Sequence, residues 1–117
     1  MARLPFRTQL PVRAIAVSGH SMNPTYQHDD WLLFRTLNTN ETKSSQRLVG
    51  KVVVVERESY PGILLIKRVI RVDKTGIWVE GDNKSASTDS RQWGAVTAPE
   101  VIGRVLLRYK RGRAVKP

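Results

Sequence analysis

The sequence predicts a mostly-β single domain over residues 1–117, and three observations carry this prediction. Six short segments are rich in valine, isoleucine, leucine and aromatic residues, which favour strands. Turn-forming residues separate these segments, and the only good helix candidate is short. The length is close to the commonest size of one domain. We expect residues 1–11 and 111–117 to be mobile tails.

The expected strands follow one another through short connections. They span residues 12–17, 31–36, 49–57, 63–73, 77–80 and 101–109. Residues 60–62 (Tyr-Pro-Gly) and 73–76 (Asp-Lys-Thr-Gly) have the composition of hairpin turns. Residues 38–47 lack apolar periodicity and are expected to form an exposed loop, and residues 82–91 form a second polar loop.

Helical structure is expected at two places only. One short helix should begin near Ser21 and end before His28, with Pro24 limiting its propagation. A single turn is expected at residues 99–100.

Composition excludes several kinds of site. The chain has no cysteine, which removes disulfides, thiolate catalysis and zinc–thiolate sites. With His20 and His28 as the only histidines, we expect no metal site and no other cofactor. No segment approaches the roughly 20 apolar residues of a membrane span. The N-terminus lacks the apolar core of a signal peptide, so we place the protein in the cytoplasm.

Ser21 is a candidate nucleophile because it follows a strand and precedes the expected helix. Free amides at a helix N-terminus can stabilise an oxyanion. Taken alone, a serine at this position would be interpreted as a helix N-cap. Gly19 favours the functional interpretation, because it allows a close backbone approach or an unusual φ.

A serine nucleophile needs a base, and Lys67 is the candidate. His20 and His28 form no persuasive triad with the serine, and lysine is the other base that serine nucleophiles use. Lys67 interrupts an apolar strand, on the same side as Leu65 and Val69. Burial there would lower its pKa and leave more of the amine neutral. Without other information, a solvent-face lysine would be the commoner interpretation.

The polar segment 81–91 is less random than an ordinary loop. Its aspartate, asparagine and serine side chains can bond to nearby backbone, and Asp89 can pair with Arg91. A loop braced in this way could hold Ser87 against the amine of Lys67.

In this order, the three segments resemble motifs of bacterial signal peptidase I and its relatives. Residues 21–25 (Ser-Met-Asn-Pro-Thr) match the serine motif, and residues 67–69 (Lys-Arg-Val) match the motif of the general base. Residues 81–91 match a Gly-Asp-Asn motif followed by Ser-x-Asp-Ser-Arg. Residues 93–94 and 102–104 match as well, so the resemblance covers residues 14–108.

The resemblance implies a fold and a catalytic dyad. The implied fold is the signal peptidase and SOS-repressor-like catalytic β-fold, with coiled, partly closed antiparallel sheets and one short helix after the nucleophile. The implied dyad is Ser21 as nucleophile and Lys67 as general base of a serine endopeptidase.

The resemblance also implies supporting roles. The Ser21 amide would be an oxyanion donor, and Met22 would pack beside the nucleophile. Some members have a serine where this chain has Gly19, so the expected oxyanion hole consists of backbone only. His20 is expected at the surface or in a supporting place. Ser87 would orient the lysine amine, and Asp89 with Arg91 would brace the site.

A second departure from the signal peptidases concerns the membrane anchor and the second domain, and it bears on the expected substrate. Signal peptidases carry transmembrane anchors and a large second β-domain, whereas this chain resembles a minimal soluble member. Residues 62–71 and 81–94, with the size of the chain, are most similar to the nickel-type superoxide dismutase maturation proteases. The resemblance implies a protein precursor as substrate, the N-terminal extension of nickel superoxide dismutase.

Two alternatives stay open. The first is a signal-peptidase-like or self-cleaving repressor-like protease with another substrate, although the arm before residue 14 offers no obvious cleavage site. The second is a non-catalytic basic β-barrel that binds nucleic acid, suggested by the net charge of +10. Few aromatic residues are free to stack on bases, which disfavours the second alternative. Oligomeric state is not predicted.

Overall fold

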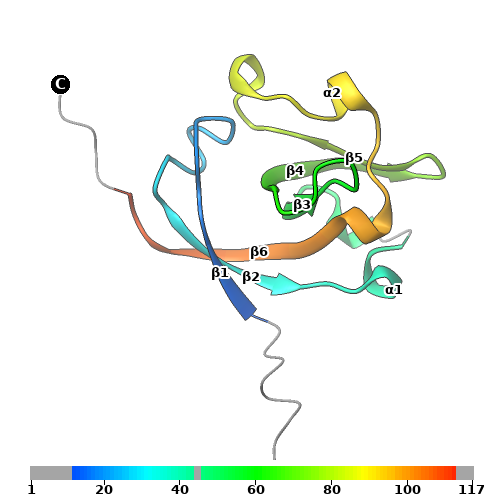
Figure 1. Ribbon diagram of the computed structural model, residues 1–117, viewed down its shortest axis with the longest axis horizontal. Coiled ribbons are helices and arrows are strands. Elements are labelled where there is room, and N and C mark those ends of the chain that lie inside the picture. The colour runs from blue at the N-terminus through cyan, green and yellow to red at the C-terminus, as the bar shows by residue number, and fades with distance from the viewer. Residues whose placement is uncertain (1–11, 44–45, 113–117) are drawn as a thin grey trace, which may run out of the picture.

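Six antiparallel strands form one sheet, in the order β1-β2-β6-β3-β4-β5 (Figure 1). The computed structural model describes residues 12–43 and 46–112. The strands are β1 (Val12–Ala16), β2 (Trp31–Thr36), β3 (Val52–Glu56), β4 (Leu64–Asp73), β5 (Gly76–Glu80) and β6 (Val101–Lys110). The predicted mostly-β fold is confirmed, and all six expected strands are present with small shifts at their ends.

Both predicted hairpins are confirmed. β3 pairs with β4, and β4 pairs with β5, each in antiparallel register. The second turn is tight because the Asp73 carboxylate accepts the Thr75 amide at 2.9 Å. Gly76 closes this turn at φ +129, and a Cβ there would lie 2.6 Å from the Val96 carbonyl oxygen. Conformation and space therefore both favour glycine at this position.

The central strand β3 is buried on both faces. Val53 and Val55 belong to a first core cluster with residues of β4 and β5, whereas Val52 and Val54 belong to a second cluster with residues of β2 and β6. Alternate residues of a strand point to opposite faces, so an uninterrupted apolar run is what a strand covered on both sides needs. The apolar run of β3 thus separates two small cores.

The expected partial closure of the sheet is wrong, since the sheet is open. Among the described residues, β1 pairs only with β2, and β5 pairs only with β4 apart from one bridge. In that bridge Ile77 and Val96 exchange two backbone hydrogen bonds of 2.8 Å. The β5 edge is thereby partly covered, and β1 remains an edge strand of the described chain.

The predicted helix after Ser21 is also wrong, because residues 21–25 form turns. The Asn23 amide donates to the His20 carbonyl at 3.1 Å, and the Tyr26 amide donates to the Met22 carbonyl at 3.0 Å. Pro24 has no N–H to continue such a series, so these bonds do not extend into a helix.

Short helices occupy the two segments that were predicted to be loops. In the first, α1 (Thr39–Thr42) begins at a capping box between Asn38 and Glu41, and η2 (Gln46–Leu48) follows. Reciprocal side-chain bonds satisfy the free amides of the first turn, which a composition-based reading of polar residues misses.

The second polar segment contains η3 (Lys84–Ala86) and α2 (Ser90–Trp93), the latter capped by Asp89. The turn predicted at residues 99–100 is confirmed as η4 (Ala98–Glu100). None of the helices in the described residues has the length and apolar character to cross a membrane.

Of the expected tails, residues 1–11 and 113–117 lie outside the described residues. Gly112 was expected to be mobile, but its amide donates to the buried Asp30 carboxylate at 2.7 Å. The ordered chain therefore continues at least to this hydrogen bond.

Candidate active site

Lys67 lies in the middle of β4, opposite Val53 of the central strand, and only 3% of its surface is exposed. Leu65 and Val69 flank it on the same face. Val69 belongs to the first core cluster, and Leu65 packs against that cluster. This burial excludes the solvent-face alternative for the lysine. A buried ammonium is costly, so the groups that meet its Nζ atom decide its chemistry.

A hydroxyl group meets the lysine amine. Lys67 Nζ donates to Ser87 Oγ at 3.0 Å, and Ser87 Oγ donates to Asp89 Oδ2 at 2.6 Å. The serine hydroxyl therefore separates the amine from the nearest carboxylate in this chain of hydrogen bonds. The predicted contact between Ser87 and the Lys67 amine is confirmed.

Asp89 is completely buried and is held as a carboxylate. Burial alone would raise its pKa, but hydrogen bonds from Arg91, Ser87 and the Gly81 amide outweigh it and hold the pKa of Asp89 far below its ordinary value. The Arg91 Nε–H donates to Asp89 Oδ1 at 2.9 Å, and the Gly81 amide donates to Oδ2 at 2.9 Å. This carboxylate is a fixed negative charge at neutral pH.

Three influences act on the pKa of Lys67. Burial lowers the pKa most, the negative charge of Asp89 raises it, and the positive charge of Arg91 lowers it again. The net result is a pKa below the ordinary value for lysine. A larger share of this amine is therefore neutral at neutral pH than for a surface lysine.

The turn that carries Ser21 is bonded to the same region. The Ser21 carbonyl accepts the Asn83 amide at 2.8 Å. A Cβ on buried Gly81 would overlap both the Ser21 carbonyl oxygen and Ser87 Oγ. Only glycine at position 81 lets the serine turn and the Ser87 hydroxyl meet there, so Ser21, Ser87 and Lys67 are neighbours although far apart in sequence.

Ser21 itself is half-buried. Within the described part of the chain, no hydrogen bond uses its amide, and none joins its hydroxyl to Lys67 Nζ. Catalytic hydrogen bonds are often long or poorly aligned without substrate, and they shorten in the reactive complex.

The other predicted residues of the serine segment take different places. Gly19 has φ +85, which favours glycine, and its amide donates to His28 Nδ1 at 2.9 Å. His20 is exposed; its carbonyl accepts Asn83 Nδ2 at 3.0 Å, and its ring Nδ1 lies 3.5 Å from Asn23 Nδ2. Met22 is 1% exposed in the second core cluster and anchors the turn.

The sequence interpretation missed a second polar link across the site. Arg68 donates two hydrogen bonds to the Asp82 carboxylate, at 2.8 and 2.7 Å, and the Thr25 hydroxyl donates to the same carboxylate. All three matched motifs contribute one residue each. The signal was available, because Arg68 alternates with Lys67 along the strand and Asp82 belongs to the Gly-Asp-Asn motif.

No group of three or more histidine, aspartate or glutamate side chains suited to a metal ion occurs in residues 12–43 and 46–112. The site therefore consists of a half-buried serine, a buried amine of lowered pKa, and a hydroxyl and carboxylate that orient the amine. These groups can activate a serine for attack on a carbonyl carbon.

Comparison with known proteins agrees with this chemistry. The sequence profile of the family described as Peptidase S24-like matches residues 2–106. Mitochondrial inner membrane protease subunit 1 of Xenopus tropicalis is 30% identical, over 80% of this chain and 66% of that protein. The proteins of the same name from Mus musculus and Homo sapiens are 30% and 29% identical, over 80% of this chain and 67% of each. The chain thus spans about two thirds of the length of these relatives.

Proposed function

Because the chain belongs to the Peptidase S24-like family, we propose that it is a serine endopeptidase with Ser21 as nucleophile and Lys67 as general base. One observation supports the dyad above all others. A lysine that is 3% exposed, with a lowered pKa, directs its amine at a serine hydroxyl instead of pairing directly with a carboxylate. A buried lysine with a purely structural role normally forms a direct ion pair with a carboxylate.

In the proposed first step, the neutral Lys67 amine takes the proton of the Ser21 hydroxyl while Oγ bonds to the carbonyl carbon of the scissile peptide. The carbonyl π electrons move onto oxygen, and the Ser21 amide N–H donates to this oxyanion. Lys67, now an ammonium, returns the proton to the leaving amine as the C–N bond breaks. Water then releases the acyl group by the same exchange of protons.

Ser87 and Asp89 position the base in this scheme. The Ser87 hydroxyl donates to the carboxylate, so its oxygen lone pairs are free to accept an N–H of Lys67. This contact orients the amine and leaves its nitrogen lone pair for Ser21. Since a hydroxyl oxygen lies between them, the carboxylate stabilises the ammonium less than a direct ion pair would.

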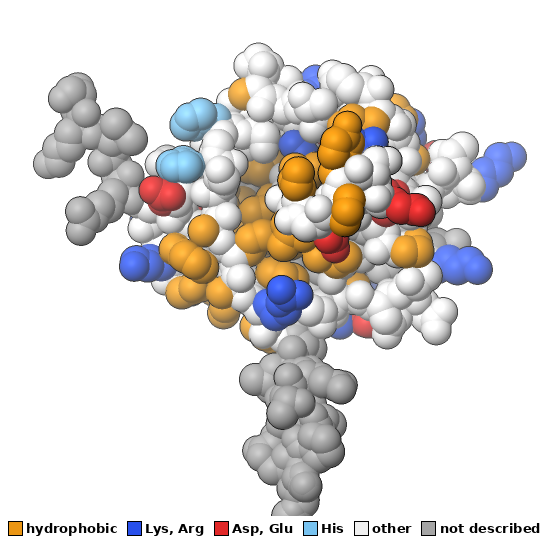
Figure 2. All heavy atoms as spheres, viewed as in Figure 1, with side chains coloured by type: hydrophobic (Ala, Val, Ile, Leu, Met, Phe, Trp, Pro, Cys, Tyr) orange, Lys and Arg blue, Asp and Glu red, His pale blue; other side chains and the backbone are white. Residues whose placement is uncertain are grey.

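The substrate would be an extended peptide along β1. This strand pairs only with β2 among the described residues, and its chain leads directly into the turn that carries Ser21. Partly buried Ile15, Leu64 and Ile102 pack against the second core cluster. Hydrophobic side chains also gather in the middle of the face seen in Figure 2. An extended peptide can add to an edge strand and place alternate side chains on such a surface.

We further propose the N-terminal extension of a nickel superoxide dismutase precursor as the substrate. This proposal is supported by the resemblance of residues 62–71 and 81–94 to the maturation proteases of that enzyme. The cytoplasmic location stays a prediction, and cell fractionation would test it.

The experiment combines the purified chain with such a precursor, and mass spectrometry reads the N-terminus of the product. The wild-type protein and Ser18→Ala, which changes an exposed serine nearby, should make one cut, and Ser21→Ala should make none. Cleavage by Ser21→Ala would contradict the assigned nucleophile. If no variant cuts this precursor, and the wild type but not Ser21→Ala cleaves a peptide library, the substrate is wrong and Ser21 stands as the nucleophile.

A further inference from the structure

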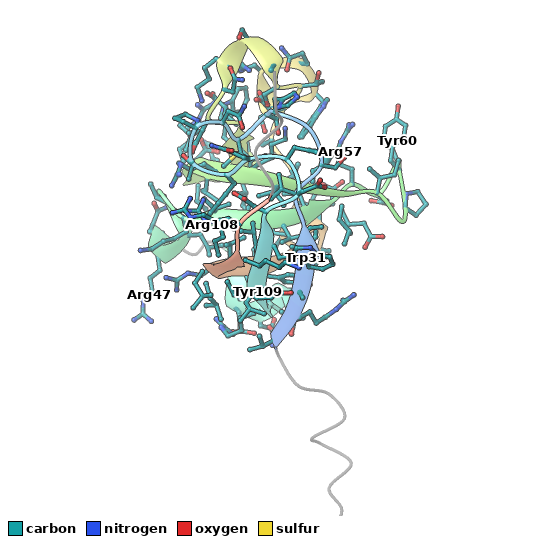
Figure 3. The ribbon with its side chains drawn as sticks, turned by 90° about the vertical axis from the view of Figure 1, so that its left-hand side faces the viewer. Trp31, Arg47, Arg57, Tyr60, Arg108 and Tyr109 are labelled. Carbon is teal, nitrogen blue, oxygen red and sulfur yellow. The ribbon has the colours of Figure 1, made fainter. Side chains whose placement is uncertain are left out.

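A basic pocket of about 470 Å³ lies on the sheet away from the residues of the proposed dyad. Four cationic side chains line it: Arg35 of β2, Arg104 of β6, Lys43 at the end of α1 and Arg47 of η2. Glu41 is its one carboxylate among the described residues. Arg47 extends outward from the body of the protein at the margin of the view in Figure 3.

Two of these arginines are direct cross-strand partners. Arg35 and Arg104 are paired in the register of β2 and β6. Directly paired residues point to the same face with Cβ atoms about 4.5–5.5 Å apart, and like charges at such positions are destabilising. The pair is therefore unfavourable unless an anion lies between or beside the two guanidinium groups.

Glu41 neutralises only part of this charge. Its carboxylate accepts Arg35 Nη1 at 2.8 Å, and this hydrogen bond holds the pKa of Glu41 below its ordinary value. Glu41 is therefore ionised at neutral pH, but its carboxylate is already paired with Arg35. Four cations against one carboxylate leave the pocket with a positive excess.

The most specific indication of a bound anion comes from Arg104. Its Nε atom is buried and has no hydrogen-bond partner in the described structure. Buried polar atoms in native proteins are almost always hydrogen-bonded, and an exception calls for an explanation such as a bound ion. Guanidinium groups bind carboxylate and phosphate oxygens in a planar, two-bond geometry.

We propose that this basic pocket binds a small polyanion through its phosphate or carboxylate groups. The volume is within the range of small-ligand sites and exceeds what one water molecule or a single chloride would fill. None of the four cations belongs to the proposed dyad or to its bracing residues, so the binding is separate from catalysis. Its test needs no substrate.

The test is isothermal titration of the full chain with inorganic pyrophosphate and, separately, with citrate at low salt. The wild-type protein should bind at least one of them with a stoichiometry of one, and added potassium chloride should weaken the binding. Arg104→Met should weaken it by about 10- to 100-fold, because one charge-assisted pair of hydrogen bonds is lost. A preference for pyrophosphate or for citrate identifies a phosphate or a carboxylate ligand.

Arg71→Met is the matched control. Arg71 lies on β4, is exposed and stacks on Trp78 at 4.1 Å, outside the pocket. This variant should bind as the wild type does. Absence of saturable binding of both anions to the wild type, or an equal loss in Arg71→Met and Arg104→Met, would overturn the proposal.

A second measurement protects the test against a variant that does not fold. In the NMR spectrum of the wild-type protein, pyrophosphate or citrate should shift the Arg104 Nε–H resonance at saturation. The Nε–H resonance of Arg71 should stay in place. No shift of the Arg104 resonance at saturating anion would contradict the proposed contact.

Discussion

Lys67 and Arg68 are neighbours in sequence, but they occupy opposite faces of β4 and meet their carboxylates in different ways. Arg68 binds Asp82 directly through two hydrogen bonds. Lys67 reaches Asp89 only through the hydroxyl of Ser87. The hydrogen bonds that Arg68 donates to Asp82 raise the pKa of Arg68, whereas burial lowers the pKa of Lys67.

The difference shows how one strand holds a permanent cation beside a titrating amine. A direct ion pair stabilises the charged form, and a hydroxyl spacer weakens that stabilisation while it still orients the amine. We therefore interpret the Arg68 side as structural and the Lys67 side as the proposed base. Breaking each side in turn should affect different properties.

The largest effect is expected on the Lys67 side. Lys67→Met keeps the length of the side chain but removes the amine, so cleavage should fall by about 10³-fold or more. Stability should be unchanged or higher, because an apolar side chain replaces a buried cation. Peptide cleavage and thermal unfolding measure the two effects, and Lys51→Met at an exposed position is the control. Activity within a few-fold of the wild type would remove Lys67 from the mechanism.

Removal of the spacer should have a smaller effect on cleavage. Ser87→Ala leaves the Lys67 amine without its orienting partner, and we expect kcat to fall by about 10- to 100-fold through misplacement of the base. Ser85→Ala, which alters an exposed serine of η3 just before Ser87, should leave kcat unchanged. Equal rates for the two variants would show that Ser87 does not position the amine.

The Arg68 side should respond in stability more than in chemistry. Asp82→Asn weakens two charge-assisted bonds, and we expect the free energy of unfolding to fall by about 1–3 kcal/mol. Hydrogen bonding from Arg68 lowers the pKa of Asp82, so its contribution is present above about pH 4 and is lost as the pH falls. Urea unfolding at pH 7 and pH 3 should therefore differ more in the wild type than in Asp82→Asn, with Glu58→Gln as an exposed control.

The smallest expected effect is an alkaline change in stability. The folded state binds the Lys67 proton less tightly than the unfolded state, because burial lowers the folded pKa. Stability should then rise with pH between that lowered pKa and about 10.4, by at most about 1.4 kcal/mol for each pH unit. Lys67→Met should lack this rise in urea unfolding measured from pH 7 to 10. An identical rise in both proteins would contradict a lowered pKa in the folded state.

Sequence patterns predicted the parts of this molecule that depend on local composition. Apolar runs correctly predicted all six strands, and the Pro-Gly and Asp-Lys-Thr-Gly stretches correctly predicted two hairpins. The prediction of a short helix after Ser21 was wrong, because the backbone amides there form turn hydrogen bonds that Pro24 cannot continue. The α1 helix was missed because a reciprocal pair of side-chain bonds decides it.

The candidate site was predictable only in part. Motif order indicated Ser21, Lys67 and Ser87, and the structure brings them together. The role of Gly81 depends on a close approach of two segments far apart in sequence, which composition cannot show. The charge excess around Arg104 was also hidden, because its members come from β2, β6, the end of α1 and η2. Only the register of the sheet places them side by side.

The most direct test of the account is the titration of Lys67 itself. NMR of the Ser21→Ala protein with labelled lysine side chains would follow each ε-amine from pH 6 to 11, with exposed Lys51 as an internal reference. We predict a midpoint for Lys67 below about 10.4, the ordinary value for a lysine side chain. A midpoint at or above the ordinary lysine value would mean that the amine stays charged, and Lys67 could not then serve as the base for Ser21.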